Sequence, residues 1–177
     1  MLALGTPTPD FVLPDVVSGQ TISLATFADK DVLLVMFICP HCPYVIHVQE
    51  GIAQLGRDNV ARPVGIVAIS SNDAEAYPSD SPAGMRGQAS ALGFQFPYCY
   101  DESQDVARAY QAACTPEFYV FDRARRLVYR GQFDDSRRHT AIPVSGKYVR
   151  AAIENTLAGR AVDADQRPSI GCNIKWR

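Results

Sequence analysis

The chain of 177 residues lacks the features that mark several large classes of protein. It has no basic run longer than the pairs Arg125-Arg126 and Arg137-Arg138, and its formal net charge is −2. Such a chain gives no electrostatic reason to bind nucleic acid or an anionic membrane surface. No segment approaches the ~20 consecutive apolar residues that a membrane-spanning helix needs. We therefore expect neither nucleic acid nor a membrane among its partners.

The N-terminus also lacks the pattern of a secretory signal. Pro7, Pro9 and Asp10 interrupt its apolar residues, and no basic residue precedes them. We therefore expect a cytoplasmic protein, a class in which disulfide frameworks are rare. Five cysteines in such a chain favour redox chemistry or metal binding, and the odd number leaves at least one thiol without an intramolecular disulfide partner.

The composition is that of an ordinary globular chain, with 47% hydrophobic and 20% charged residues. That balance argues against disorder. There are no internal repeats and no linker, and the length is sufficient for a sizeable core. The sequence therefore predicts one domain over residues 1–177.

The hydrophobic pattern predicts an α/β fold. A short hairpin over 11–24 precedes a continuous apolar strand at 32–38, and a second such strand covers 63–70. Unbroken apolar strands are typical of a sheet that is covered on both faces. Helices are predicted at 43–55, 83–92, 103–112 and 146–158, with a short strand at 97–100 and a β-hairpin formed by EFYVFD and LVYRGQF.

The order of these elements implies a central mixed sheet with helices on both faces. Gly56 is predicted to end the first helix and Gly159 the last one, because glycine is common just after a helix. Ser145 is the predicted cap at the start of the last helix.

Two cysteines stand close together where the strand 32–38 gives way to a helix. Cys39 follows the strand and Cys42 falls in the first turn of the helix, with Pro40 and His41 between them. Reacting groups gather beyond the carboxyl ends of parallel strands. The positive end of the helix is expected to stabilise a thiolate at Cys39, and His41, when protonated or donating a hydrogen bond, to act in the same direction.

This placement predicts a redox-active dithiol, because a thiolate attacks a disulfide and a second thiol nearby resolves the product. A structural zinc site needs a further pair of cysteine or histidine ligands at its own spacing, which the sequence does not show. Metal binding by Cys39 and Cys42 and an inert pair of thiols are the alternatives.

The segment CTPEFYVFD carries a second signal. Pro116 directly precedes a predicted strand, and the Thr115-Pro116 bond is a candidate for the cis form, which folded proteins keep where a tight turn needs it.

Several segments together resemble the thioredoxin superfamily. FICPHCPYV before a helix, CTPEFYVFD further on and the order βαβ followed by ββα carry the general resemblance. The segments SSNDAEAYPSDSP, YRGQFDDSR, PVSGKYVRAAI and PSIGCNIKW resemble its single-domain peroxiredoxin-like branch, the alkyl hydroperoxide reductase/thiol-specific antioxidant group. The resemblance implies a thioredoxin-like fold with an N-terminal β-hairpin extension.

The same resemblance implies roles for individual residues. Cys39 would be the nucleophile, Cys42 the resolving thiol and Pro116 a cis-proline that faces the pair. Thr115 would then pair through its backbone with an extended peptide substrate, which adds a short strand.

The chain departs from its relatives at three positions. Peroxiredoxins carry a proline and a threonine where this chain has Val32 and Met36, neither of which can hydrogen-bond a peroxide. Thioredoxin carries a buried, proton-accepting acid at the position of Leu33. Glu117, next to Pro116, is the nearest candidate for that role, and an exposed carboxylate at a strand end is the simpler alternative.

The other cysteines allow more than one interpretation. Cys114 precedes Thr115, and Cys172 lies near the C-terminus. They would form a second dithiol or relay pair, complete a metal site with the first pair, or be two inert buried thiols. Cys99 is expected only to pack in the core.

The sequence thus predicts a thiol–disulfide oxidoreductase that uses the Cys39-Pro40-His41-Cys42 dithiol, with no metal and no cofactor beyond its redox-active disulfide. Its partners would be protein or small-molecule disulfides and thiols, and a cytosolic reductant would recharge it. A thiol peroxidase using Cys39 and a metal-binding thiolate protein are the rival hypotheses. Asn72 and Asp73 would frame the substrate groove, and nothing in the sequence marks an oligomeric state.

Overall fold

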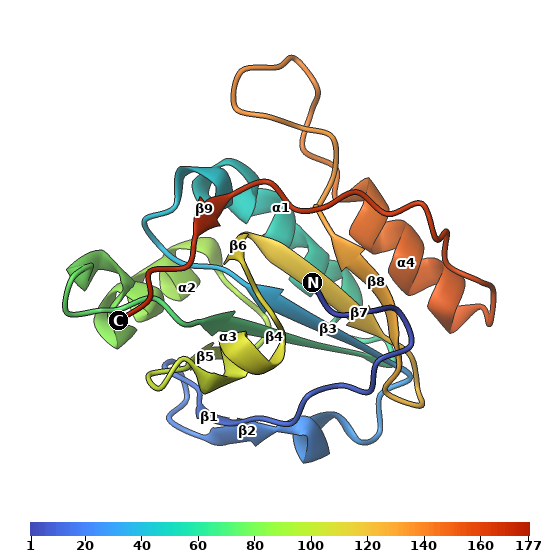
Figure 1. The fold of residues 1–177 in the computed structure, drawn as a ribbon, viewed down its shortest axis with the longest axis horizontal. Coiled ribbons are helices and arrows are strands. Elements are labelled where there is room, and N and C mark those ends of the chain that lie inside the picture. Colours follow the sequence, from blue (N-terminus) through green and yellow to red (C-terminus); the bar gives the residue numbers. More distant parts are fainter.

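The computed structural model describes all 177 residues and has a five-stranded mixed sheet at its centre, in the order β5-β4-β3-β7-β8 (Figure 1). β3 (Val32–Phe37), β4 (Val64–Ser70) and β5 (Tyr98–Tyr100) are parallel, while β7 (Glu117–Phe121) and β8 (Leu127–Gly131) join antiparallel. β3 and β4 are buried along their whole length, as their unbroken apolar sequences predict.

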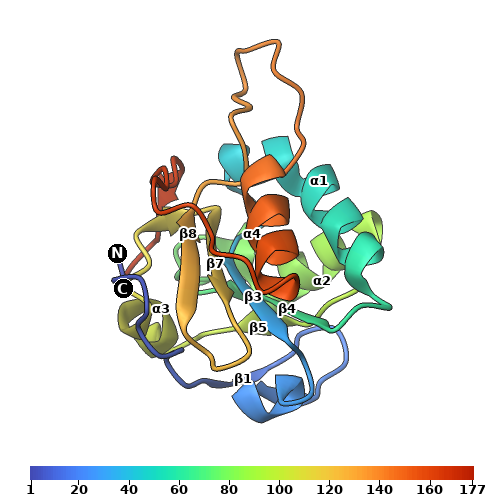
Figure 2. The same cartoon turned by 90° about the vertical axis from the view of Figure 1, so that its right-hand side faces the viewer.

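Helices cover both faces of this sheet, so the predicted α/β, thioredoxin-like fold is confirmed. α1 (Pro43–Asn59), α2 (Pro82–Leu92) and α4 (Lys147–Leu157) pack on one face. The short α3 (Asp105–Ala109), the hairpin of β1 (Val12–Pro14) and β2 (Thr21–Ser23), and the 3-10 turn η1 (Leu24–Phe27) close the other. Figure 2 shows α1 and α4 on one side of the strands and α3 on the other.

Three helices differ from the prediction. α3 is shorter than the expected helix at 103–112. α1 does not end at Gly56, because that residue gives room to the ring of Phe96, and a Cβ there would lie 2.7 Å from a ring carbon. Ser145 does not cap α4, because α4 begins at Lys147 and its N-cap residue is Gly146. Gly146 precedes α4 instead, with a left-handed φ of 66° that favours glycine.

The end of the chain returns to the middle of the molecule. β6 (Cys114–Thr115) leads into a peptide bond to Pro116 that is cis, as predicted. β9 (Cys172–Asn173) pairs antiparallel with β6, so that Thr115 lies opposite Cys172 (Figure 1). We call residues 168–177 the C-terminal segment. It occupies the backbone edge of Thr115 that the resemblance assigned to an extended peptide substrate.

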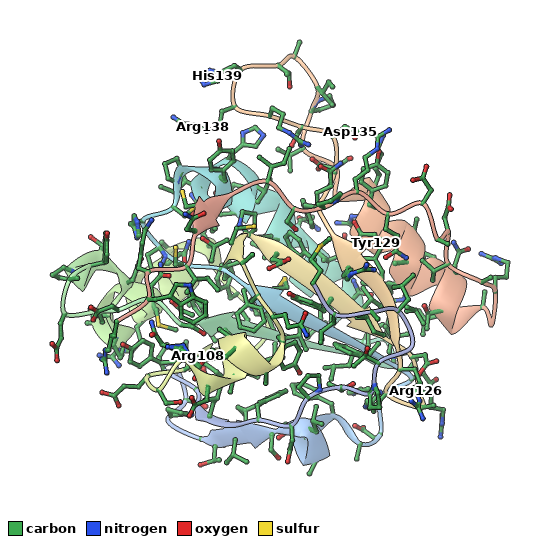
Figure 3. All side chains as sticks on the ribbon, viewed as in Figure 1. Arg108, Arg126, Tyr129, Asp135, Arg138 and His139 are labelled. Atoms are coloured by element: carbon green, nitrogen blue, oxygen red, sulfur yellow. The ribbon has the colours of Figure 1, made fainter.

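The loop between β8 and α4 stands away from the sheet, with Arg138 and His139 in its outer part (Figure 3). None of the helices combines the length and the apolar character that crossing a membrane requires.

Candidate active site

The junction of β3 and α1 holds the two predicted active cysteines. Cys39 follows β3, and Cys42 is the N-cap residue of α1, whose first helical position is Pro43. Proline suits that position because its missing N–H would have no partner there. Both cysteines are fully buried free thiols that are not at disulfide distance. The structure therefore describes the reduced state of the pair.

Thr115 contacts both sulfur atoms. Its Oγ1 lies 3.5 Å from Cys39 Sγ, and its carbonyl oxygen accepts a hydrogen bond of 3.1 Å from Cys42 Sγ. The fold thus brings together Cys39, Cys42, Thr115 and the cis-proline Pro116, although more than seventy residues of chain separate the two halves of the group.

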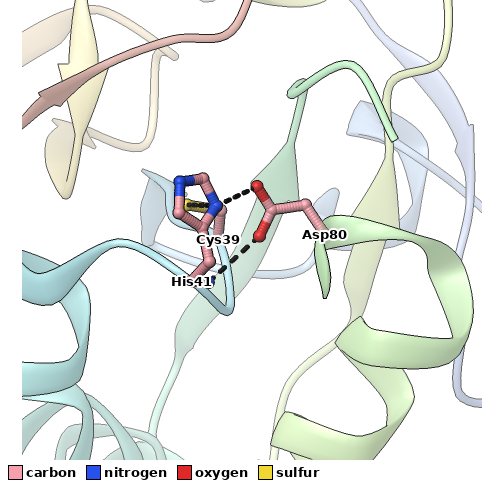
Figure 4. A group of neighbouring side chains, drawn as sticks. All are labelled: Cys39, His41 and Asp80. Atoms are coloured by element: carbon pink, nitrogen blue, oxygen red, sulfur yellow. Dashed lines mark hydrogen bonds and ion pairs between the residues drawn. The ribbon is translucent and has the colours of Figure 1, made fainter. Parts of the chain in front are cut away.

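His41 is held beside Cys39 by a carboxylate that the sequence analysis missed. Asp80, the last residue of the 3-10 turn η2 (Pro78–Asp80), accepts a hydrogen bond of 3.0 Å from the backbone N–H of His41. Its second oxygen pairs with His41 Nδ1, which lies 4.0 Å from Cys39 Sγ (Figure 4). An ionised Asp80 can only accept, so the proton of this short contact belongs to Nδ1. The site therefore contains an imidazole–carboxylate pair next to one of its thiols.

The buried side-chain amide of Asn72 orients the His41–Asp80 pair. Asn72 donates a hydrogen bond of 2.8 Å to Asp80, which has no exposed surface. The ring of Tyr77 stacks on His41 with 5.3 Å between the ring centroids. Asn72 was expected at the substrate groove and does reach the site, as a partner of Asp80. Asp73, expected beside it, forms an ion pair of 3.4 Å with Arg177 instead.

Glu117 is buried, so the alternative of an exposed carboxylate at a strand end is wrong. Its carboxylate accepts a hydrogen bond of 2.9 Å from the backbone N–H of Ala113, and no hydrogen bond joins it to either sulfur. Burial raises the pKa of Glu117. The acid that lies next to Cys39 is Asp80, and Glu117 stays a prediction as a proton acceptor.

The two active thiols hold their protons unequally. The hydrogen bond between the sulfur atoms, followed by burial and then by the charge of Asp80, raises the pKa of Cys39. The same hydrogen bond lowers the pKa of Cys42, the N-cap residue, to about 4. The predicted lowering at Cys39 is therefore not found, because burial and a buried carboxylate oppose the effect of the helix N-terminus. At a pH above the lower of the two pKa values, these shifts leave one proton on the reduced pair.

That remaining proton has a favourable site on each sulfur. On Cys42 it is donated to the Thr115 carbonyl at 3.1 Å, and the charge then rests on Cys39. On Cys39 it neutralises the thiol next to the charge of Asp80. A shift of one proton between the sulfurs therefore moves the nucleophile from one cysteine to the other.

Of the other cysteines, only Cys172 joins the pair. It lies against Cys42, and burial followed by this contact raises its pKa to about 11. Cys114 precedes Thr115 on β6, so its side chain points to the opposite side of the strand. The β6–β9 register places Asn173 opposite Cys114, so the alternative of a Cys114–Cys172 pair is not formed. Cys99 is buried between the sheet and α3, as expected for a packing residue.

The site also has the composition of a metal centre. One ligand atom each from Cys39, His41 and Asp80 lies within 4.8 Å of the other two. Sulfur, imidazole and carboxylate ligands suit zinc. A metal ion bound there would have to replace the hydrogen bond between Asp80 and His41.

Two solved structures resemble the whole chain. One is an uncharacterized conserved protein from Geobacillus kaustophilus, with 51% identity and a TM-score of 0.97 over 100% of this chain and 94% of that one. The other is a hypothetical protein from Sinorhizobium meliloti 1021, with 47% identity and a TM-score of 0.97 over 100% and 96%. Neither printed description states an activity.

More distant structures share the fold. A thiol:disulfide interchange protein from Chlorobium tepidum is 18% identical, with a TM-score of 0.67 over 89% of this chain and 99% of that one. No curated protein matches the chain. The family model of Redoxin matches residues 3–144, which is most of the sequence. The chain therefore belongs to the Redoxin family.

Proposed function

We propose that the protein is a thiol–disulfide oxidoreductase in which Cys39 and Cys42 alternate between two thiols and one disulfide. The observation that carries the proposal is the arrangement of both sulfurs around Thr115, one at its hydroxyl and one at its carbonyl, directly before a cis-proline. Membership of the Redoxin family supports thiol redox chemistry in general. The specific exchange between these two residues is our inference from the geometry.

The cycle begins when the remaining proton moves from Cys39 to Cys42, which places the negative charge on Cys39. The Cys39 thiolate attacks one sulfur of a substrate disulfide, a mixed disulfide forms, and the first substrate thiolate leaves. Cys42 gives up its proton and attacks Cys39 Sγ. The Cys39–Cys42 bond forms, and the second substrate thiolate leaves. Two electrons have then passed to the substrate, and an external thiol reductant must return them to the Cys39–Cys42 disulfide.

His41 and Asp80 lie where protons must move during this cycle. The side chain of His41 is 27% exposed, whereas Asp80 and Cys39 are fully buried. The imidazole therefore connects the buried sulfur with solvent and can deliver a proton to a leaving thiolate. The charge of Asp80 opposes a thiolate at Cys39. Asp80 is thus a positioning residue that fixes the ring and sets the charge balance.

The test is an equilibrium of the full-length protein with mixtures of reduced and oxidised glutathione, followed by alkylation and mass analysis. We expect two alkylation sites, Cys39 and Cys42, to disappear together as the mixture becomes more oxidising, and a peptide pair joined by their disulfide to appear. The Cys42→Ser variant should instead retain glutathione on Cys39. A wild-type protein that forms no Cys39–Cys42 disulfide in any mixture would rule the proposal out.

The same samples separate the rival hypotheses. Val32 and Met36 are buried in β3 and offer no hydrogen-bond donor to a peroxide. Rapid consumption of hydrogen peroxide with sulfenic acid on Cys39 would nevertheless favour a thiol peroxidase. One equivalent of zinc that survives dialysis and is lost in Cys39→Ser would favour the metal-binding hypothesis.

A further inference from the structure

The C-terminal segment lies directly on the active site. β9 pairs with β6 so that Cys172 is opposite Thr115, the residue that contacts both active sulfurs. Gly171 makes this approach possible, because a Cβ at its position would lie 2.0 Å from the Thr115 carbonyl oxygen. Only a glycine lets the two backbones come so close. The position of Cys172 is therefore built into the fold.

Hydrogen bonds of Lys175, three residues after Cys172, hold the C-terminal segment in place. The backbone N–H of Lys175 donates to the Asn72 side chain at 2.8 Å, and the N–H of Asp73 donates to the Lys175 carbonyl at 2.8 Å. The Gln104 side chain donates to the same carbonyl at 2.9 Å. The partners of Lys175 are thus two separate parts of the chain, so Cys172 is not carried by a loose tail.

The three thiols of this cluster differ in their access to solvent. Cys39 and Cys42 are fully buried, while Cys172 is partly exposed. Cys172 also packs against the buried cluster that contains Cys39 and Cys42. A thiol in solution cannot reach the buried pair in this conformation, but it can reach the outer side of Cys172. Of the three thiols, only Cys172 is therefore accessible to a thiol in solution.

We propose that Cys172 is a third redox thiol, which passes electrons between low-molecular-weight thiols in solution and the buried Cys39–Cys42 pair. This inference rests on the proposed function, because it supplies the external reductant's route to the same disulfide. Low-molecular-weight thiols fit the structure better than peptides, since β9 occupies the backbone edge of Thr115 along which an extended peptide would pair.

The exchange balances as three thiol–disulfide steps. In the oxidised protein the Cys172 thiolate attacks Cys42 Sγ, the Cys39–Cys42 bond breaks, the Cys42–Cys172 bond forms, and Cys39 takes up the proton that Cys172 lost. An external thiolate RS⁻ then attacks Cys172 Sγ and Cys42 leaves as a thiolate. A second RS⁻ releases RSSR and frees Cys172. Two external thiols are oxidised and one protein disulfide is reduced.

The first experiment uses the full-length Cys39→Ser variant, in which Cys42 cannot form a disulfide with residue 39. Treated with oxidised glutathione and mapped by peptide mass, it should contain a Cys42–Cys172 disulfide. Cys39→Ser/Cys114→Ser is the matched control and should form the same disulfide, because Cys114 points to the other side of β6. A Cys39→Ser protein that carries glutathione on Cys42, with Cys172 still free, would overturn the inference.

The second experiment measures the rate at which reduced glutathione reduces the oxidised protein. Cys172→Ser keeps the size of the side chain and should slow this reduction by at least about tenfold, while Cys114→Ser should leave the rate unchanged. An unchanged rate in Cys172→Ser would also overturn the inference. Failure of the proposed function looks different, because the wild-type protein would then contain no Cys39–Cys42 disulfide at equilibrium.

Discussion

The two sulfur atoms of the site have different surroundings, which we call the Cys39 side and the Cys42 side. The Cys39 side consists of His41, Asp80 and Asn72, all of them polar and linked by hydrogen bonds. The Cys42 side consists of the backbone of Thr115 and the third thiol, Cys172. One side can supply or remove protons, and the other can exchange sulfur partners. The proposed dithiol cycle needs both functions, and we assign one to each side.

The C-terminal segment connects the two sides. Cys172 packs against the buried cluster that contains Cys42, and three residues later the backbone N–H of Lys175 donates to Asn72, which in turn donates to Asp80. A change in the segment is therefore expected to reach both thiols, whereas a change at Asp80 or Cys172 should act on one. The following variants test this division, beginning with the largest expected effect.

Removal of either active sulfur should have the largest effect, and the two variants should fail differently. Cys39→Ser is expected to lower the reduction of oxidised glutathione by roughly 100-fold or more, because the nucleophile is absent. Cys42→Ser should react once and stop as a mixed disulfide on Cys39. Steady-state rates with intact-protein mass spectra check both outcomes. Equal loss in both variants without an adduct in Cys42→Ser would contradict the assignment of roles.

Gly171→Ala should disturb both sides at once. The added Cβ would meet the Thr115 carbonyl oxygen at 2.0 Å, so the C-terminal segment must move away from β6. We expect the free energy of unfolding to fall by about 1–3 kcal/mol and Cys39 and Cys42 to be alkylated faster. Gly87→Ala is the matched control, because nothing lies within 4 Å of its Cβ position. Urea titration and timed alkylation measure the two effects, and Gly171→Ala behaving like the control would contradict the packing described here.

Asp80→Asn should act on the Cys39 side alone. The sulfur–sulfur hydrogen bond and burial raise the pKa of Cys39 first, and the charge of Asp80 adds to them. Removal of that charge should therefore lower the pKa of Cys39, so that the second thiolate of the pair forms at lower pH. The first thiolate, from the pKa of about 4 at Cys42, should stay in the acidic range.

The ultraviolet absorbance of thiolates, followed from acidic to alkaline pH, measures both steps for Asp80→Asn. Asp58→Asn is the control, because Asp58 pairs with Arg150 at the end of α1 that is far from the sulfurs. A second step in Asp80→Asn at the same pH as in the wild type would show that the carboxylate does not act on Cys39.

The sequence predicts those parts of the site whose residues are contiguous in the chain, and not those that tertiary packing brings together. β3, Cys39 and Cys42 are contiguous, and an unbroken apolar strand followed by a proline-started helix predicts their geometry directly. Asp80 lies 39 residues from His41, within a loop that contains several carboxylates, and only tertiary packing decides which one turns inward.

Cys172 was harder to place for the same physical reason. Its strand has two residues, too few for any hydrophobic period, and its partner strand is far away in the sequence. The sequence therefore left a Cys114–Cys172 pair open as an alternative. The register of β6 and β9, which places Thr115 and not Cys114 opposite Cys172, is set by long-range contacts alone.

The smallest expected effect concerns the end of the C-terminal segment and acts mainly on the Cys42 side. The ring of Trp176 is 42% exposed and lies under the guanidinium of Arg108, 4.6 Å from the ring centroid. Trp176→Ala should cost about 0.5–1 kcal/mol, the range of an exposed cation–π contact. We expect slightly faster alkylation of Cys172 and an unchanged pH profile of the pair, because the hydrogen bonds of Lys175 and Asn72 stay in place. A shifted pH profile in Trp176→Ala would mean that the two sides are not separable, and that the segment controls proton transfer as well as sulfur exchange.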